Sequence, residues 1–339
     1  MKIISRIKES VKNLKAISLF SGGLDSQLAV CLIKDQGVDV IGINFVTPFF
    51  GAEERTKQAA KDLGIEFHYL DIGPDYMDVL KKPIYGYGKN MNPCIDCHGY
   101  MFKRASQYLQ EFNASFLISG EVLGQRPMSQ NKSALQVVNK LSGQPGLILR
   151  PLSAQLLAPT IPETEGWVDR SRLLDISGRS RSRQMQLAEH YGIKDYPSPA
   201  GGCLLTQENF SRRLKMLLAL KPDAEAADTE ILKLGRHLYI NEDQLLVISR
   251  NHDENIKLQK LALEEDYLIK VVDRPGPLGL LRLNRIDDKA QIEFAARIVA
   301  RYSDAKGENI ANMKVSKISG DEISLQVVPL PAEEVPALV

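Results

Sequence analysis

Residues 21–26, Ser-Gly-Gly-Leu-Asp-Ser, are the stretch of sequence that decides the fold. They directly follow a short apolar run at residues 16–20 and directly precede a helical pattern over residues 25–36. The two glycines let backbone N–H groups converge on an anion, the serine hydroxyls add donors, and the helix N-terminus supplies partial positive charge. This order of strand, glycine loop and helix predicts a site for a pyrophosphate group.

The loop differs from two common phosphate-binding motifs. It lacks the Gly-Lys-Ser/Thr ending of a Walker A loop, and it does not fit the GxGxxG pattern of dinucleotide-binding folds. The plain alternative is a tight turn in which Asp25 and Ser26 act only as helix caps. The position of all six residues between a strand and a helix favours the anion site.

Short apolar, β-rich runs alternate with helical patterns beyond this loop. Strands are expected at residues 16–20, 38–46, 66–71 and 115–119, and helices at 25–36, 53–63, near Asp75 and at 97–112. This alternation predicts an α/β fold with a doubly wound parallel sheet, in which ligands bind beyond the carboxyl ends of the strands. Residues 119–121, which include Gly120, end a later expected strand, so a second set of ligand contacts is predicted there.

The chain divides into three expected segments. Residues 1–150 form the phosphate-loop domain, residues 151–225 form a connecting segment that carries Cys203, and residues 226–339 form a smaller C-terminal α+β module. The acidic stretch 222–230 is interpreted as a linker or boundary. Apolar residues spaced along 3–14 predict an amphipathic first helix.

The composition is that of an ordinary globular protein. Among 339 residues, 43 Lys and Arg balance 42 Asp and Glu, and 44% of residues are hydrophobic. No apolar run reaches the length of a membrane span, and the charged start lacks the apolar stretch of a secretory signal, so we expect a cytoplasmic protein without membrane association. The balanced charge excludes a uniformly basic nucleic-acid binder, so any RNA contact must come from local patches such as the arginines of residues 169–183.

Three of the four cysteines lie in contexts that indicate chemistry. Cys94 and Cys97 form a CxxC motif at the entry to an expected helix, where the helix N-terminus favours thiolate. Cys203 follows two glycines in a turn-dense loop. Cys31 lies among apolar residues and is expected in the core. The alternatives are a zinc knuckle, a redox pair, or cysteines that are unrelated to one another.

The phosphate loop resembles the signature of a known family, the N-type PP-loop ATP pyrophosphatases. These enzymes cleave ATP to AMP and pyrophosphate and transfer AMP to a carbonyl oxygen. The resemblance implies that Asp25 lies near Mg²⁺ and has a catalytic role. The residues it implies around the β- and γ-phosphates of ATP are Ser21, Gly22, Gly23 and Ser26.

The cysteine contexts narrow the resemblance further. An Asn-Pro-Cys sequence at Cys94 and a later Gly-Gly-Cys at Cys203 resemble the tRNA thiouridine synthetases, notably the 2-thiouridylases. The resemblance implies an ATP-dependent sulfurtransferase that adenylates a uridine carbonyl in tRNA and replaces its oxygen by sulfur. The implied sulfur donor is a cysteine desulfurase or free sulfide.

Two versions of the sulfur chemistry stay open. In one, Cys94 or Cys97 carries a persulfide, which Cys203 resolves by forming a disulfide. In the other, all three cysteines bind a four-iron four-sulfur cluster whose fourth iron is open for hydrosulfide, as the resembling cluster-dependent thiolases suggest. A persulfide relay needs only two cysteines, so the presence of three favours the cluster.

Two other functions fit the same motifs. One is a PP-loop thiolase or amidase that acts on a small molecule, and the other is a non-catalytic RNA-binding or sulfur-carrier protein. The resemblance covers the chain to about residue 220. The C-terminal module does not resemble the barrel domains of the 2-thiouridylases, so the sequence assigns it no role.

Overall fold

The structure, a computed structural model, describes residues 14–198, 202–241, 244–272, 274–283 and 289–339. The helix expected over residues 3–14 lies, except for Leu14, outside the described residues, as does Gly201. The chain forms two compact units, Met1–Thr206 and Gln207–Val339, which divide the expected connecting segment 151–225 between them. In the described part of the chain, no helix has the length and apolar character needed to cross a membrane.

The first unit is built on a five-stranded sheet with the strand order β3-β2-β1-β4-β5. Every neighbouring pair of strands is parallel. The strands are β1 (Lys15–Leu19), β2 (Asp39–Val46), β3 (Glu66–Asp71), β4 (Phe116–Ser119) and β5 (Ile148–Leu149). The predicted doubly wound α/β fold is therefore confirmed.

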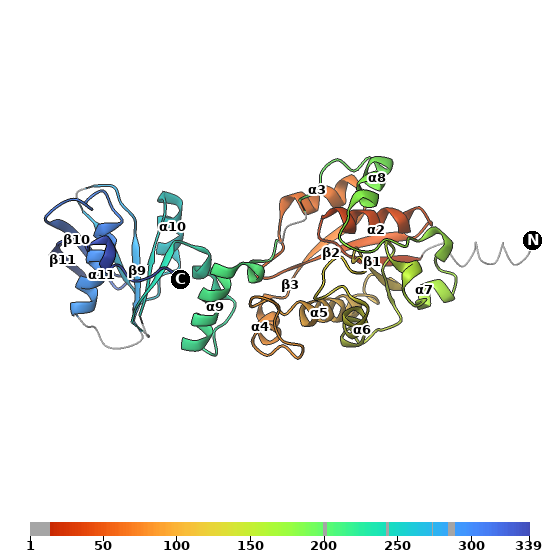
Figure 1. Cartoon of the computed structure of the whole chain (residues 1–339), viewed down its shortest axis with the longest axis horizontal. Coiled ribbons are helices and arrows are strands. Elements are labelled where there is room, and N and C mark those ends of the chain that lie inside the picture. The colour runs from red at the N-terminus through yellow and green to blue at the C-terminus, as the bar shows by residue number, and fades with distance from the viewer. Residues whose placement is uncertain (1–13, 199–201, 242–243, 273, 284–288) are drawn as a thin grey trace, which may run out of the picture. The chain divides into compact units, whose positions relative to one another are not determined.

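Helices cover both faces of this sheet. They are α2 (Leu24–Lys34), α3 (Glu54–Asp62), α4 (Gly73–Lys81), α5 (Cys94–Gln107), α6 (Lys132–Leu141), α7 (Ile161–Thr164) and α8 (Ser182–Tyr191). Figure 1 shows α2, α3 and α8 on one face and α4, α5 and α6 on the other. Strand β4 is buried along its whole length, as expected for a parallel strand with helices on both sides.

The ends of β1 and β4 lie where the strand order reverses, which means that the chain adds strands on one side of β1 and then on the other. The chain moves from β1 towards β2 and β3 on one side, and it returns to β4 and β5 on the other. In open α/β sheets, ligands bind beyond the carboxyl ends of the strands at this point. Residues 21–26 follow β1 and residues 120–131 follow β4, so both loops lie at the expected ligand crevice.

The second unit is built on a six-stranded sheet with the order β11-β10-β8-β9-β7-β6. All of its neighbouring strand pairs are antiparallel. Its strands are β6 (Arg236–Asn241), β7 (Gln244–Ile248), β8 (Tyr267–Val271), β9 (Gly279–Leu283), β10 (Ala311–Lys317) and β11 (Glu322–Val327). Its helices are α9 (Glu208–Leu220), α10 (His252–Lys260) and α11 (Lys289–Arg301). Helix α11 packs on strands β8 to β11, and its buried Ile292 and Val299 join the core of this unit.

The prediction of a linker at residues 222–230 is wrong. Part of this stretch belongs to a 3₁₀ helix, Ala227–Lys233, that packs against α9. Ala224 and Thr229 are fully buried there, and Ile231 is buried beside them. The acidic side chains suggested a solvated segment, but the small and apolar residues between them anchor it to the core.

Gly120 allows the closest backbone contact at the ligand crevice. A Cβ atom at this position would lie 2.5 Å from the amide nitrogen of Ser26 in the first turn of α2. We therefore expect Gly120→Ala to destabilise the first unit by roughly 1–3 kcal/mol, because the loop after β4 must move away from α2. Denaturant unfolding followed by the fluorescence of the single tryptophan, Trp167, measures this, since its ring packs on Phe116 of β4.

Gly202→Ala is the matched control for this experiment. At Gly202 the nearest atom to an added Cβ is the Glu53 Oε1 at 3.8 Å, which is ordinary contact. This variant should keep the stability of the wild-type chain to within about 1 kcal/mol. Equal stability of the two variants would contradict the close packing of Gly120 on α2.

Candidate nucleotide and thiol site

The phosphate loop has a backbone that requires glycine. Gly22 has a φ of +71°, in the left-handed region, and a Cβ there would lie 2.9 Å from the Cα of Thr56 in α3. The Thr56 hydroxyl donates to the carbonyl of Ser21 at 3.2 Å, which holds α3 against the loop. Glycine at position 22 therefore satisfies both a dihedral angle and a close approach.

The first turn of α2 is left open towards the loop. Gly23 is the N-cap residue, and no side chain caps the helix. The Ser26 hydroxyl donates to the carbonyl of Gly23 at 2.8 Å, and Gln27 Nε2 donates to the carbonyl of Gly22 at 2.8 Å. The loop carbonyls are thus turned back into the protein, while the helix N-terminus faces the crevice as an anion site would require.

Asp25 is a half-buried carboxylate that lacks one partner. Its Oδ2 accepts a hydrogen bond from Gln125 Nε2 at 3.1 Å, whereas its Oδ1 is buried without a partner among the described residues. Burial raises the pKa of Asp25, although the bond from Gln125 and the charges of Arg181 and Arg126 act in the opposite direction. The free oxygen suits a hard cation such as Mg²⁺, which prefers carboxylate oxygen ligands.

The CxxC motif lies in the first turn of α5, which begins at Cys94, three residues earlier than predicted. Cys94 is half-buried and accepts a hydrogen bond from Asn92 Nδ2 at 3.2 Å, while Cys97 is buried. Asp96, between the two cysteines, accepts hydrogen bonds from the backbone of Ile84 and Tyr85. These bonds fix the start of the helix against the preceding loop.

The structure brings Cys203 to the same place. Its loop is held by a hydrogen bond from the Leu204 amide to the Phe49 carbonyl, and by one from Asn90 Nδ2 to the Thr206 carbonyl at 2.7 Å. The thiols of Cys94, Cys97 and Cys203 lie close enough to interact electrostatically with one another and with the buried hydroxyl of Tyr76. The three thiols singled out in the sequence therefore form one cluster.

The prediction that the helix N-terminus favours thiolate is wrong for Cys97. Burial raises the pKa of Cys97 far above that of an ordinary thiol, and burial also raises the pKa of Cys203 to about 11. Cys31 lies in the core as predicted, and burial raises its pKa to about 11. In the described part of the chain, no three His, Cys, Asp or Glu side chains are arranged to hold a metal ion.

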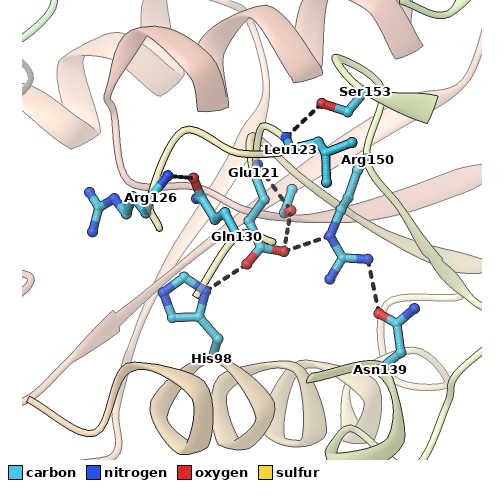
Figure 2. Close-up of polar contacts among 9 residues, drawn as sticks. His98, Glu121, Leu123, Arg126, Gln130, Asn139, Arg150 and Ser153 are labelled. Carbon is cyan, nitrogen blue, oxygen red and sulfur yellow. Dashed lines mark hydrogen bonds and ion pairs between the residues drawn. The ribbon is translucent and has the colours of Figure 1, made fainter. Parts of the chain in front are cut away.

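A buried charge network joins the cysteine helix to the loop after β4 (Figure 2). Glu121 Oε1 pairs with His98 Nδ1 at 2.7 Å, and Arg150 Nε donates to Glu121 Oε2 at 2.8 Å. Burial alone would raise the pKa of Glu121, but the charge of Arg150 and the contact with His98 outweigh it and lower the pKa to about 2. Because His98 follows Cys97 and Glu121 follows Gly120, the network connects the thiol cluster to the phosphate loop.

The sequence predicts ligand contacts at residues 119–121, which stays a prediction, and the structure shows the contacts that these residues make within the protein. Glu121 contacts protein side chains, and Gly120 packs on the first turn of α2. Neither His98 nor Arg150 was predicted to pair with Glu121. The pairing of Glu121 with Arg150 spans 29 residues of sequence, and no local pattern marks it.

Arg126 is the residue that relates the two halves of the site. It lies on the exposed loop after β4, and its charge partly offsets the burial that raises the pKa of both Asp25 and Cys203. The preceding residue, Gln125, donates to Asp25 Oδ2 at 3.1 Å, so Arg126 lies next to the phosphate loop. Sequence reasoning missed this arginine, because a single basic residue in a turn gives no signal.

The arginines of residues 169–183 are mostly engaged inside the first unit. Arg170 pairs with Glu163, Arg172 donates to the Asp35 carbonyl, and Arg183 pairs with Asp175. These three side chains support the fold of their own segment, which weakens the interpretation of the segment as an RNA-binding patch.

Two family models match the chain. Residues 12–155 match the model described as "Thiamine biosynthesis protein (ThiI)". This part of the first unit is therefore similar to a ThiI protein. Residues 235–338 match the model described as "NFACT protein RNA binding domain". The C-terminal module, to which the sequence assigned no role, is therefore similar to an RNA-binding domain.

Curated relatives of this chain include two proteins that are named for tRNA modification. A probable tRNA sulfurtransferase of Thermococcus kodakarensis is 30% identical over 41% of this chain and 36% of its own length. A tRNA-specific 2-thiouridylase MnmA of Marinobacter nauticus is 25% identical over 68% of this chain and 60% of its own length. This chain thus spans between about a third and three fifths of these relatives. A solved 4-thiouridine synthetase–RNA complex with bound ATP has a TM-score of 0.39 at 21% identity, over 64% of this chain and 52% of that chain.

The Glu121 network predicts a specific loss of stability at low pH. Because the folded pKa of Glu121 is lowered to about 2 from an ordinary value of 4.5, its contribution is present above pH 4.5 and is lost as the pH falls towards 2. Glu121→Gln should destabilise the first unit by about 3–5 kcal/mol at pH 7, because Arg150 is left buried with less compensation. Unfolding followed by Trp167 fluorescence at several pH values measures both effects.

Glu66→Gln is the control for this prediction. Glu66 pairs with His68 on the surface, with half of its side chain exposed, so its removal should cost less than about 1 kcal/mol. If Glu121→Gln and Glu66→Gln have the same stability at pH 7, the buried network does not contribute as described.

Proposed function

We propose that this chain is an ATP-dependent tRNA sulfurtransferase, which adenylates a uridine carbonyl and replaces its oxygen by sulfur. The observation that carries the proposal is that the loop after β4 contacts both parts of the site, because Gln125 bonds to Asp25 of the phosphate loop and Glu121 pairs with His98 next to Cys97 of the thiol cluster. A reaction that first activates an oxygen with ATP and then attacks the same carbon with sulfur needs both groups around one substrate atom.

The phosphate loop is the proposed site for ATP. Ser21, Gly22, Gly23 and Ser26 would surround the β- and γ-phosphates at the N-terminus of α2, which no side chain caps. The free Oδ1 of Asp25 would hold Mg²⁺, which supplies charge neutralisation at the phosphates when it is bound. The match to the ThiI model supports nucleotide use in this unit.

The proposed reaction has two steps. The uridine oxygen attacks the α-phosphorus of ATP, the bond from the α-phosphorus to the bridging oxygen breaks, pyrophosphate leaves with the electron pair, and the N3 proton passes to solvent. Hydrosulfide sulfur then attacks the activated carbon, the carbon–oxygen bond breaks, and AMP leaves while the sulfur-bound proton passes to N3. Backbone N–H groups at the start of α2 stabilise the charge that develops on pyrophosphate in the first step.

Cys94, Cys97 and Cys203 are the proposed ligands of a four-iron four-sulfur cluster, with the persulfide relay as the alternative. Their closeness around Tyr76 supports a shared role in sulfur chemistry, although the described side chains are not arranged to hold a metal ion without a change in their positions. The raised pKa values of Cys97 and Cys203 mean that neither is a ready nucleophile by itself, whereas a bound metal deprotonates a thiol outright. When bound, the cluster would supply an open iron for hydrosulfide.

The second unit supports tRNA as the substrate. Its match to an RNA-binding family favours an RNA substrate over a small molecule, and relatives of the chain are tRNA-modifying proteins. The sulfur donor, a cysteine desulfurase or free sulfide, and the cytoplasmic location stay predictions from the sequence. A non-catalytic RNA-binding or sulfur-carrier protein is the alternative that lacks pyrophosphate release.

The activity is tested by incubating the full chain with ATP, Mg²⁺, sulfide and total tRNA without oxygen. We expect pyrophosphate release that depends on tRNA, and thiouridine in the digested tRNA by mass spectrometry. Gly22→Ala should reduce both by at least about tenfold, because its Cβ meets the Thr56 Cα and occupies a strained φ. Gly202→Ala, which adds no such contact, serves as the control for folding.

The outcomes of this assay separate the candidate functions. Pyrophosphate release without thiouridine would favour the small-molecule enzyme, and tRNA binding without pyrophosphate release would favour the non-catalytic carrier. Binding to tRNA should weaken steeply as the salt concentration rises, because RNA contacts are largely contacts to phosphate. If the affinity for tRNA does not change with salt concentration, the proposed action on tRNA is contradicted.

The cluster has its own test. The chain purified without oxygen should be brown and contain iron and acid-labile sulfide, and replacing Cys94, Cys97 or Cys203 by Ala should remove both. Cys31→Ala should keep the iron, because Cys31 is a core residue outside the thiol cluster. Zinc in place of iron, or iron that survives each of the three replacements, would overturn the cluster in favour of the persulfide relay.

A further inference from the structure

Several buried polar atoms beside the phosphate loop have no hydrogen-bond partner. In the described part of the chain these include Asp25 Oδ1, Arg181 Nε, and both amide atoms of Gln184, a residue with no exposed surface. More than nine in ten buried polar groups in proteins are hydrogen-bonded, so exceptions that gather at one place indicate a missing ligand. Arg181 and Gln184 lie at the start of α8, which packs on α2, and Asp25 lies in the first turn of α2, so these atoms gather beside the phosphate loop.

Helix α8 fixes Arg181 and Gln184 in this position. Figure 1 shows α8 beside α2, and Ala188 of α8 shares a core cluster with Leu24 and Leu28 of α2. Arg181 is the N-cap residue of α8, and its guanidinium carbon lies 5.9 Å from the centre of the Tyr196 ring. The packing therefore holds a cation next to the first turn of α2.

Arg126 approaches the same carboxylate from the loop after β4. This loop is anchored by a hydrogen bond from the Gly124 amide to the Gln130 carbonyl at 2.7 Å, and by one from the Leu123 amide to the Ser153 hydroxyl at 2.9 Å. In Figure 2 the Arg126 side chain points away from the Glu121 network. Within the described residues, its guanidinium forms no ion pair or hydrogen bond, so it is free to bind a ligand.

We propose that Arg126 and Arg181 form a clamp on the phosphates of the nucleotide, with Arg181 on the pyrophosphate group and Arg126 on the α-phosphate. Guanidinium groups bind phosphate oxygens through two parallel hydrogen bonds, which suits two arginines that converge from different elements. The clamp rests on the proposed function, since it requires ATP in the phosphate loop.

The assignment of each arginine follows from what each one faces. Arg181 is the N-cap residue of α8, whose Ala188 packs with Leu24 in the first turn of α2, where the β- and γ-phosphates are proposed to bind. Arg126 lies on the loop after β4, in which Gln125 bonds to Asp25 and Glu121 pairs with His98 next to Cys97. The α-phosphate is the group that is bonded first to the leaving pyrophosphate and then to the substrate oxygen, so it lies between the phosphate loop and the thiols. Arg126 is therefore placed to stabilise charge in both steps.

The experiment measures the binding of ATP, AMP and pyrophosphate to the full chain by calorimetry with Mg²⁺ present. Arg181→Gln should weaken ATP and pyrophosphate binding by at least about tenfold and leave AMP binding nearly unchanged. Arg126→Gln should weaken ATP and AMP binding by a similar factor and leave pyrophosphate binding nearly unchanged. The Lys variants should recover only part of the loss, because lysine lacks the paired donors.

Arg183→Gln is the matched control on the same helix. Its guanidinium pairs with Asp175 on the surface, away from Asp25, so its loss should change none of the three affinities. Thermal unfolding followed by Trp167 fluorescence shows that a variant is folded if its unfolding curve matches that of the wild-type chain.

The outcomes distinguish the clamp from the proposed function. If Gly22→Ala abolishes ATP binding while both arginine variants bind as Arg183→Gln does, the clamp is overturned and the proposed function stands. If Arg181→Gln weakens AMP binding and Arg126→Gln weakens pyrophosphate binding, the assignment of the two arginines is overturned. If the wild-type chain binds no ATP, the proposed function and the clamp both fail.

Discussion

The parallel pairing of β1 with β4 is the constraint on which the candidate site depends. It places the loop after each strand at the same edge of the sheet, and it forces the backbone at Gly120 against the first turn of α2. A side chain at Gly120 would separate the two loops. The sheet therefore sets the position of the phosphate loop relative to everything that follows β4, including Glu121 and Arg126.

The Glu121 network also fixes the cysteine helix α5 relative to the sheet. Glu121 contacts His98 of α5 and Arg150 beyond β5, so the cysteine helix is joined to the middle of the sheet by buried charges. Such pairs are costly to desolvate, and their value is often a fixed geometry rather than a gain in stability. Here the network fixes the position of Cys97, which precedes His98, relative to Asp25, because Gly120 before Glu121 packs against the backbone at Asp25.

The sequence predicted the features that have a local signature. Strand and helix periodicity identified the parallel sheet, and the two glycines identified the phosphate loop. Strand β9 was missed because Pro275 and Pro277 precede it and make its region resemble a loop. Arg126, the burial of Gln184 and the pairing of Glu121 depend on contacts between distant parts of the chain, which periodicity does not reveal.

The burial of Cys203 also affects how readily its thiol reacts with oxidants and electrophiles. With a pKa of about 11, Cys203 is ionised in on the order of one molecule in ten thousand at pH 7. Peroxides and electrophiles react with thiolates, so Cys203 without a ligand reacts slowly with them. The same burial means that Cys203 loses its proton readily only to a partner that binds the sulfur, such as a metal ion.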